Sequence, residues 1–258
     1  MTLHRPRKRF GQHFLHDPLV LDKIVLSIEP DNTDTIVEIG PGEGALTCPL
    51  LTRLDKMIAI ELDRDLAPAL QEKCQPIGEL ELHNTDALKF DFCQLITGNK
   101  KIRIVGNLPY NISTPLLFHL ADHARCIQDL HVLVQREVAH RIISPPGNKN
   151  YGRLSVMMQL YFFTEALFEV SPGAFRPPPK VQSTFLRLIP HSQPPVEILN
   201  QNRFSSIVAA AFSQRRKTLR NCLKGILDSS QIEQAGIDPG VRAETLPLEA
   251  FAALSNVE

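Results

Sequence analysis

Short apolar segments recur along the chain and alternate with segments of helical character, and this alternation constrains the fold most. Apolar runs of this length, bounded by turn residues, are typical of buried strands. The segments that predict strands are 35–40, 57–62, 80–85, 102–107, 130–135, 166–170 and 183–189. Because strands that alternate with helices form a mostly parallel sheet covered on both faces, we predict an α/β fold.

The character of the chain changes after Pro190, and this change predicts a domain boundary. Before it, helix starts such as Asp17-Pro18, a capping residue followed by proline, separate the strands. Segment 154–162 fits both periodicities, and its length and its Met and Leu content favour a helix. Beyond the linker 191–195, apolar residues recur at helical spacing. We therefore predict a catalytic domain at 1–190 and a small helical domain at 196–258.

Composition excludes several classes of protein. The chain has 258 residues, of which 43% are hydrophobic and 22% charged, as in ordinary globular proteins. No apolar run approaches the roughly 18 residues that span a membrane, and no signal peptide is evident at the N-terminus. The five cysteines lie far apart without a Cys-x-x-Cys pair, so neither a metal site nor a disulfide framework is expected. These features favour the reducing cytoplasm.

Positive charge gathers in two clusters, although the formal net charge is zero. The first comprises Arg5, Arg7, Lys8 and Arg9, and the second comprises Arg215, Arg216, Lys217 and Arg220. Local clusters bind phosphate even on a neutral protein, so the second cluster is a candidate RNA-binding surface. The alternative for either cluster is a solvated tail or helix face.

The strand predicted at 102–107 ends in Asn107-Leu108-Pro109-Tyr110, which indicates a ligand site. In open α/β sheets, ligands bind beyond the carboxyl ends of the strands. The Asn107 side-chain oxygen and the Leu108 carbonyl can both accept hydrogen bonds from one exocyclic amine, while Tyr110 stacks on the ring that carries it. This combination suits chemistry on the amino group of a flat base. The alternative is an ordinary Asn/Pro turn.

Three further strand ends carry residues that fit a nucleoside cofactor. Gly40 and Gly42 lie in a loop whose spacing differs from the Gly-x-Gly-x-x-Gly of dinucleotide-binding proteins. Glu61 follows about 20 residues later and can accept from ribose hydroxyls. Asp86 can accept from an adenine amine. Either acid alone is more often a helix cap or a surface group, but together with Asn107 they indicate S-adenosylmethionine, which has no phosphates.

Motifs across nearly the whole chain resemble those of the rRNA adenine N6,N6-dimethyltransferases, most closely the bacterial small-subunit type. They are GQHFL (11–15), EIGPG (38–42), ELD (61–63), DA (86–87), NLPYNISTP (107–115), YGRLS (151–155), FRPPPKVQS (175–183), QRRKTLR (214–220) and RAE (242–244). The resemblance implies a class I S-adenosylmethionine-dependent methyltransferase with a Rossmann-like seven-stranded sheet and a small C-terminal helical domain.

The resemblance also implies a reaction and a set of site residues. The substrate would be two adjacent adenosines in the 3′-terminal hairpin loop of 16S rRNA in the immature small subunit, with four methyl groups transferred to their N6 amines. The oligomeric state stays open, and a monomer is our default expectation. Cofactor-binding positions carried over are His13, Leu15, Gly40, Gly42, Glu61, Asp86 and Asn107; the family usually has Asn where His13 stands. The catalytic candidates are Asn107, Leu108, Pro109, Tyr110 and Phe175, with Tyr110 and Phe175 covering opposite faces of the base.

Other functions remain open at this point. Large-subunit rRNA dimethylases of the macrolide-resistance type share the core motifs, although the neutral charge and the YGRLS segment favour the small-subunit type. A largely non-catalytic ribosome assembly factor is a second alternative. A DNA amino-methyltransferase would more typically carry an Asp-Pro-Pro-Tyr motif, and a dehydrogenase would need the other glycine spacing.

Overall fold

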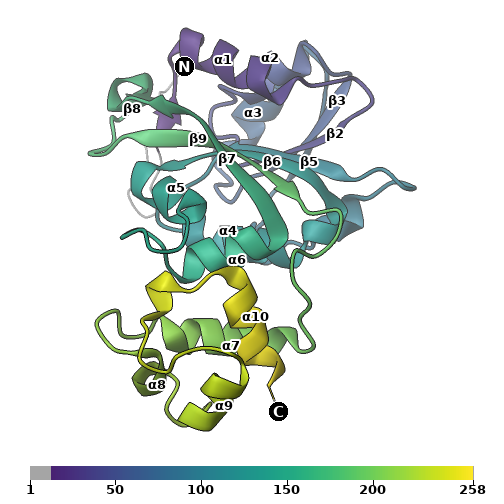
Figure 1. Ribbon diagram of the computed structural model, residues 1–258. Coiled ribbons are helices and arrows are strands. Elements are labelled where there is room, and N and C mark those ends of the chain that lie inside the picture. The colour runs from purple at the N-terminus through teal and green to yellow at the C-terminus, as the bar shows by residue number, and fades with distance from the viewer. Residues whose placement is uncertain (1–12, 258) are drawn as a thin grey trace. The chain divides into compact units, whose positions relative to one another are not determined.

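A seven-stranded sheet is the main element of the first part of the chain in the computed structural model, which describes residues 13–257 (Figure 1). The strand order is β4-β3-β2-β5-β6-β9-β7. The bounds are β2 Thr35–Ile39, β3 Lys56–Ile60, β4 Glu79–His83, β5 Ile102–Asn107, β6 Ile127–Gln135, β7 Phe162–Val170 and β9 Ser183–Pro190. A separate two-stranded sheet pairs β1 (Phe14–Leu15) with β8 (Phe175–Arg176) in antiparallel fashion.

The sheet confirms the predicted α/β class. Strands β4, β3, β2, β5 and β6 are paired in parallel, and β9 runs antiparallel to β6. Each predicted strand is present, with β7 extending further toward the N-terminus than the expected 166–170. Segment 154–162 is helical as predicted, except that its last residue, Phe162, begins β7.

The helices begin where the sequence signals place them. Asp17 caps α1, its side chain accepting from the backbone N–H groups of Leu19 and Val20, and Pro18 occupies the first turn. Helices α1, α2 and α3 lie on one face of the sheet and α4 on the other (Figure 1). The helix bounds are α1 Pro18–Ile28, α2 Thr47–Leu51, α3 Ala67–Cys74, α4 Ser113–Asp122, α5 Arg136–Ile143, α6 Arg153–Tyr161, α7 Gln201–Ala211, α8 Leu219–Cys222, α9 Ser229–Gln234 and α10 Leu248–Asn256.

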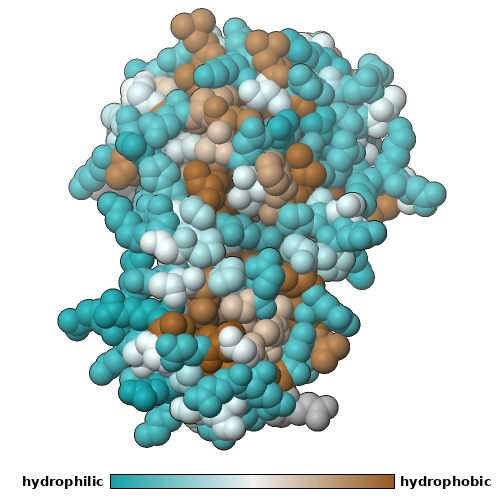
Figure 2. Space-filling view, in the orientation of Figure 1, coloured by the Kyte–Doolittle hydropathy of each residue, from teal (hydrophilic) through white to brown (hydrophobic). Residues whose placement is uncertain are grey.

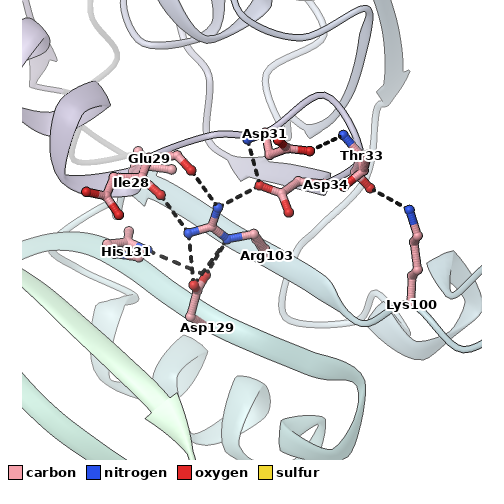
Figure 3. Close-up of polar contacts among 9 residues, drawn as sticks. All are labelled: Ile28, Glu29, Asp31, Thr33, Asp34, Lys100, Arg103, Asp129 and His131. Carbon is pink, nitrogen blue, oxygen red and sulfur yellow. Dashed lines mark hydrogen bonds and ion pairs between the residues drawn. The ribbon is translucent and has the colours of Figure 1, made fainter.

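A buried arginine ties β5 to its neighbours (Figure 3). The Arg103 guanidinium donates to Asp34 at 2.6 Å and to Asp129 of β6 at 2.9 Å. It also donates to the backbone carbonyls of Ile28 and Glu29 at the end of α1. Burial alone would raise the pKa of Asp129, but the neighbouring His131 and Arg103 outweigh it and lower the pKa. The ion pair thus joins the end of α1 to two central strands.

The chain forms two compact units, which differ from the predicted domains in one segment. Among the described residues, the first contains 13–139 and 165–190, and the second contains 140–164 and 191–257. One division between the two units falls after Pro190. Residues 140–164, including α6, were expected in the first domain but group with the C-terminal helices. The correction has a packing reason, because the buried Tyr151 side chain donates a hydrogen bond to the Leu246 carbonyl.

Most of the face drawn in Figure 2 is hydrophilic, with hydrophobic residues over α1, where Leu19 and Leu26 are exposed. Within residues 13–257, every helix is too short or too polar to cross a bilayer.

One cysteine expectation needs correction, because Cys93 and Cys126 form a disulfide. Cys48, Cys74 and Cys222 are free thiols.

Candidate active site

A cavity of about 320 Å³ opens at the carboxyl ends of β4, β3, β2 and β5, four adjacent parallel strands. It lies where open α/β sheets bind ligands. Most of the predicted site residues line it: His13, Gly40, Gly42, Glu61, Asp86, Asn107, Leu108, Pro109 and Tyr110. Sheet topology therefore brings together residues that are spread over nearly one hundred positions of the sequence.

The turn after β2 brings backbone close to the cavity. Gly40 and Gly42 have φ of +69° and +57°, a region that favours glycine. A Cβ at Gly42 would lie 2.9 Å from the Phe14 ring, so a side chain there would displace a wall of the cavity. The Gly42 N–H donates to Glu61 Oε2 at 3.1 Å, which fixes the turn against the end of β3.

Glu61 is held by the backbone of both neighbouring segments. Its Oε1 accepts from the Asp63 N–H at 2.8 Å, while Oε2 accepts from Gly42. Burial raises the pKa of Glu61, and the two backbone hydrogen bonds oppose that rise. Each carboxylate oxygen has a second lone pair, which can accept from a ligand hydroxyl. Asp86, after β4, is anchored in the same way by the Leu88 N–H at 3.0 Å to Oδ1.

Asn107 presents an unpartnered acceptor at the end of β5. Its Nδ2 donates to the His13 carbonyl at 2.8 Å, and this contact orients the amide. Oδ1 is buried and has no hydrogen-bond partner among the residues that the structure describes. Buried polar atoms are nearly always paired, so an unpaired acceptor in a cavity wall points to a ligand donor.

The Tyr110 hydroxyl is hydrogen-bonded, while the Tyr110 ring borders the cavity and is available for stacking. The hydroxyl lies 2.5 Å from Ser183 Oγ, at the start of β9. Burial raises the pKa of Tyr110, and the Ser183 hydrogen bond opposes the rise. One side of the ring stacks with His13 at a centroid distance of 5.3 Å. The His13 Nδ1–H donates to the Pro177 carbonyl at 2.7 Å, so His13 links three segments of the site.

Two predicted site residues lie elsewhere. Phe175 was expected to cover the second face of a base, but it is 2% exposed, pairs with Leu15 and belongs to the hydrophobic core. The correction follows from β8, because pairing with β1 turns this side chain inward. Leu15 lines a separate cavity of about 40 Å³, which it shares with Glu38, Gly40 and Asn107.

The second basic cluster is exposed on the C-terminal unit. Arg216, Lys217 and Arg220 are exposed, as is Arg215. Arg215 already donates to the Lys149 carbonyl and lies 3.6 Å from Glu244. The first cluster, at Arg5, Arg7, Lys8 and Arg9, lies outside the described residues.

Sequence reasoning missed several residues that shape the site. Leu62, Thr85, Ala87 and Ile112 line the cavity, although none was singled out as a site residue. Leu62, Ala87 and Ile112 lie within the quoted motifs, and Thr85 directly precedes one. Ser183 ends the FRPPPKVQS motif, but nothing in its spacing indicated that it would hold the Tyr110 hydroxyl across 73 positions.

The fold and the cavity together define a class I S-adenosylmethionine-dependent methyltransferase. The structure is similar to a crystal structure of a dimethyladenosine transferase from Plasmodium falciparum, with a TM-score of 0.76 and 26% identity over 94% of this chain and 96% of that one. It is also similar to the 23S rRNA methyltransferase ErmE, with a TM-score of 0.69 and 26% identity over 94% of this chain and 98% of that one.

Sequence comparison assigns the chain to a family within this class of methyltransferases. The model of the ribosomal RNA adenine dimethylase family matches residues 3–257, and the chain belongs to that family. A ribosomal RNA small subunit methyltransferase A from Nitrosococcus oceani is 54% identical over 98% of this chain and 96% of its own length. The protein of the same description from Methylococcus capsulatus is 52% identical over 98% of this chain and 97% of its own length.

Proposed function

We propose that this protein transfers methyl groups from S-adenosylmethionine to the N6 amines of two adjacent adenosines in the 3′-terminal hairpin loop of 16S rRNA, within the immature small subunit. Family membership and relatives about half identical over nearly the full chain support rRNA adenine methylation on the small subunit. The unpartnered Asn107 Oδ1 is the structural observation that carries the proposal.

The residues around the cavity fit S-adenosylmethionine. The glycine turn leaves room for close approach, the Glu61 carboxylate can accept from the ribose hydroxyls, and Asp86 can accept from the adenine amine. The cofactor supplies an electrophilic methyl group on a sulfonium. No group that would recognise a pyrophosphate is needed, in agreement with the spacing of the glycines.

The target adenine would be held by its amino group and its ring. An N6 amine is a weak nucleophile because its lone pair is delocalised into the ring. Asn107 Oδ1 and the Leu108 carbonyl can accept from its two N–H groups and direct the lone pair toward the methyl donor. Tyr110 stacks on the ring. Because nitrogen becomes cationic and acidic on methylation, it can lose its proton afterward without a strong base. Catalysis then rests on positioning and electrostatics.

Asn107→Ala tests this arrangement. We expect methyl transfer to rRNA to fall by on the order of 100-fold or more, because the acceptor that orients the amine is lost. Cofactor binding, measured by calorimetry, should change little. Tritium transfer to small subunits is the activity measurement, and Asn202→Ala, an exposed residue of α7, is the matched control. Near wild-type transfer by Asn107→Ala would contradict the mechanism.

The choice of ribosomal subunit has its own test. The structural similarity to ErmE is compatible with large-subunit rRNA as the substrate. The sequence identity to a small-subunit methyltransferase is about twice as high, at 54% against 26%. We expect methyl transfer to immature small subunits and none to large subunits. Mapping methylated adenines in rRNA from cells with and without the gene would identify the two positions. Binding to small subunits without methylation would instead favour the assembly-factor alternative.

The exposed basic residues of the C-terminal unit are candidates for contact with the RNA substrate. We propose that Arg216, Lys217, Arg220 and, to a lesser degree, Arg215 contact rRNA phosphates. A monomer is proposed because one chain supplies every residue of the cavity described above. A ribosomal substrate would place the protein in the cytoplasm, with a role in small-subunit biogenesis.

A further inference from the structure

Two pairs of residues whose side chains can bind a metal come together in the structure, and one pair follows the loop that carries Asp86. Asp91 and Cys93 lie at the start of the short helix η2 (Phe92–Leu95). After α4, His123 precedes η3 (Ala124–Cys126), and Cys126 is its last residue. Ligand atoms of Asp91, Cys93 and His123 all lie within 4.8 Å of one another. Cys126 is joined to Cys93, with the two Cα atoms 5.3 Å apart. Three potential ligands therefore lie close together, and the fourth, Cys126, is bonded to one of them.

The imidazole of His123 is oriented as a metal ligand. Its Nδ1–H donates to the His119 carbonyl at 2.8 Å, which leaves the lone pair on Nε2. Nε2 faces the cluster and lies 3.3 Å from Asp91 Oδ1. A backbone carbonyl that fixes the second nitrogen is the usual support of a zinc-binding histidine.

In each pair, which we call an arm, a hydrogen bond holds the two candidate ligands close together. Asp91 Oδ1 accepts from the Cys93 N–H at 3.0 Å, and the Cys126 N–H donates to the His123 carbonyl at 2.9 Å. These short turns hold the two ligands of each arm together, as the paired ligands of structural zinc sites are held. Phe92 packs edge-on against His123 at a centroid distance of 5.7 Å and shields one side.

We propose that this cluster is a redox-gated zinc site. With the disulfide closed, both sulfurs are committed to each other. A dithiol reductant opens it: one reductant thiolate attacks a cysteine sulfur, the second displaces the mixed disulfide, and the reductant leaves oxidised while Cys93 and Cys126 become thiols. Both thiols then lose protons and bind Zn²⁺ together with His123 Nε2 and an Asp91 carboxylate oxygen.

The chemistry of the donors selects the metal. Two thiolates, one imidazole and one carboxylate in a four-coordinate arrangement suit Zn²⁺ better than Mg²⁺ or Ca²⁺, which prefer oxygen ligands. Thiolates that share a tetrahedral zinc lie about 3.8 Å apart, given zinc–sulfur bonds of about 2.3 Å. Rotation of the two cysteine side chains can supply that separation from the present backbone positions.

The site has a structural consequence for the cavity. The Asp91–Cys93 arm follows the loop that carries Asp86, and the His123–Cys126 arm follows α4, which begins just after the Asn107–Tyr110 motif. His119 Nε2–H also donates to the Phe90 carbonyl at 2.8 Å, so the same two segments are already joined there. Either closed form, disulfide or zinc, would add a second connection between these segments, whereas the reduced metal-free form would lack it.

Metal titration of the full chain tests the proposal. The protein is reduced with a dithiol, freed of reductant without oxygen, and titrated with Co²⁺ and then Zn²⁺. We expect one equivalent of Co²⁺ with the visible bands of a tetrahedral site and a thiolate charge-transfer band, all displaced by Zn²⁺. Protein with the disulfide closed should show no such bands.

Variants separate this site from other thiols. Cys126→Ser and His123→Gln should abolish stoichiometric binding or the tetrahedral spectrum, with circular dichroism confirming that they fold. Cys222→Ser removes a free thiol elsewhere and should bind as wild type. Reduced wild-type protein without the cobalt–thiolate band, or a band that persists in Cys126→Ser, would overturn the proposal and leave the pair as a disulfide only. Neither outcome bears on rRNA methylation.

Discussion

Tyr110 presents two separable groups, a ring that borders the cavity and a hydroxyl tied to Ser183. Base stacking on an aromatic ring contributes roughly 1–3 kcal/mol, whereas losing one neutral hydrogen bond costs about 1 kcal/mol. We therefore expect Tyr110→Ala to reduce methyl transfer far more than Tyr110→Phe. Ser183→Ala should resemble Tyr110→Phe. Equal losses in the Ala and Phe variants would transfer the role from the ring to the hydroxyl.

Glu38 lies at the end of β2 beneath the glycine turn, and its environment makes stability depend on pH. Burial raises the pKa of Glu38 from 4.5 to about 7, although the Thr47 hydroxyl donates to it at 2.6 Å and opposes the rise. The folded protein therefore keeps a proton that the unfolded chain has already lost between these pH values. Stability contributed by this group falls as pH rises through that window, by on the order of 3 kcal/mol.

Glu38→Gln tests this dependence. The variant cannot ionise, so its free energy of unfolding should gain on wild type as pH rises from 4.5 to 7. Denaturant unfolding at several pH values measures the difference, with Glu233→Gln, an exposed carboxylate, as the control. A constant difference between Glu38→Gln and wild type across the window would show that Glu38 does not titrate there.

At the scale of elements, the strand and helix boundaries follow from local signals. Apolar runs and capping residues act within a few positions, and so Asp17 and the turn after Asn107 mark element ends correctly. Those local signals do not determine which elements pack against one another. Phe175 illustrates the limit, since a proline-rich segment is equally compatible with a cavity wall and with the core position that pairing with Leu15 imposes.

Arg103 connects several elements through its buried side chain. Its guanidinium joins β5, β6 and the end of α1 through Asp129, Asp34 and two carbonyls (Figure 3). Arg103→Met should destabilise the fold by about 3–5 kcal/mol, because the buried Asp129 and the partly buried Asp34 lose their partner. The midpoint of denaturant unfolding measures this loss. The double variant Arg103→Met/Asp129→Asn should recover part of it, and no recovery would mean that lost packing dominates.

At the scale of the whole molecule, a neutral chain carries a local basic surface. Salt dependence reports how many phosphates are contacted, at roughly 0.7 in the logarithmic slope for each contact with single-stranded nucleic acid. The triple variant Arg216→Ala/Lys217→Ala/Arg220→Ala should reduce the slope for rRNA binding by about 2. Arg215→Ala is the matched comparison and should change it less, because Arg215 is engaged by Glu244 and Lys149. An unchanged slope in the triple variant would exclude this surface.

The sequence by itself determined what depends on neighbouring residues: the alternation that makes an α/β sheet, the helix starts, and the polar residues at successive strand ends. Because parallel strands share one edge, the order of those residues was enough to predict that Gly40, Glu61, Asp86 and Asn107 meet. Only the tertiary structure decided the burial of Phe175, the hold of Ser183 on Tyr110, the grouping of residues 140–164 and the meeting of Cys93 with Cys126. Each of these depends on contacts between segments far apart in the chain, which local periodicity does not encode.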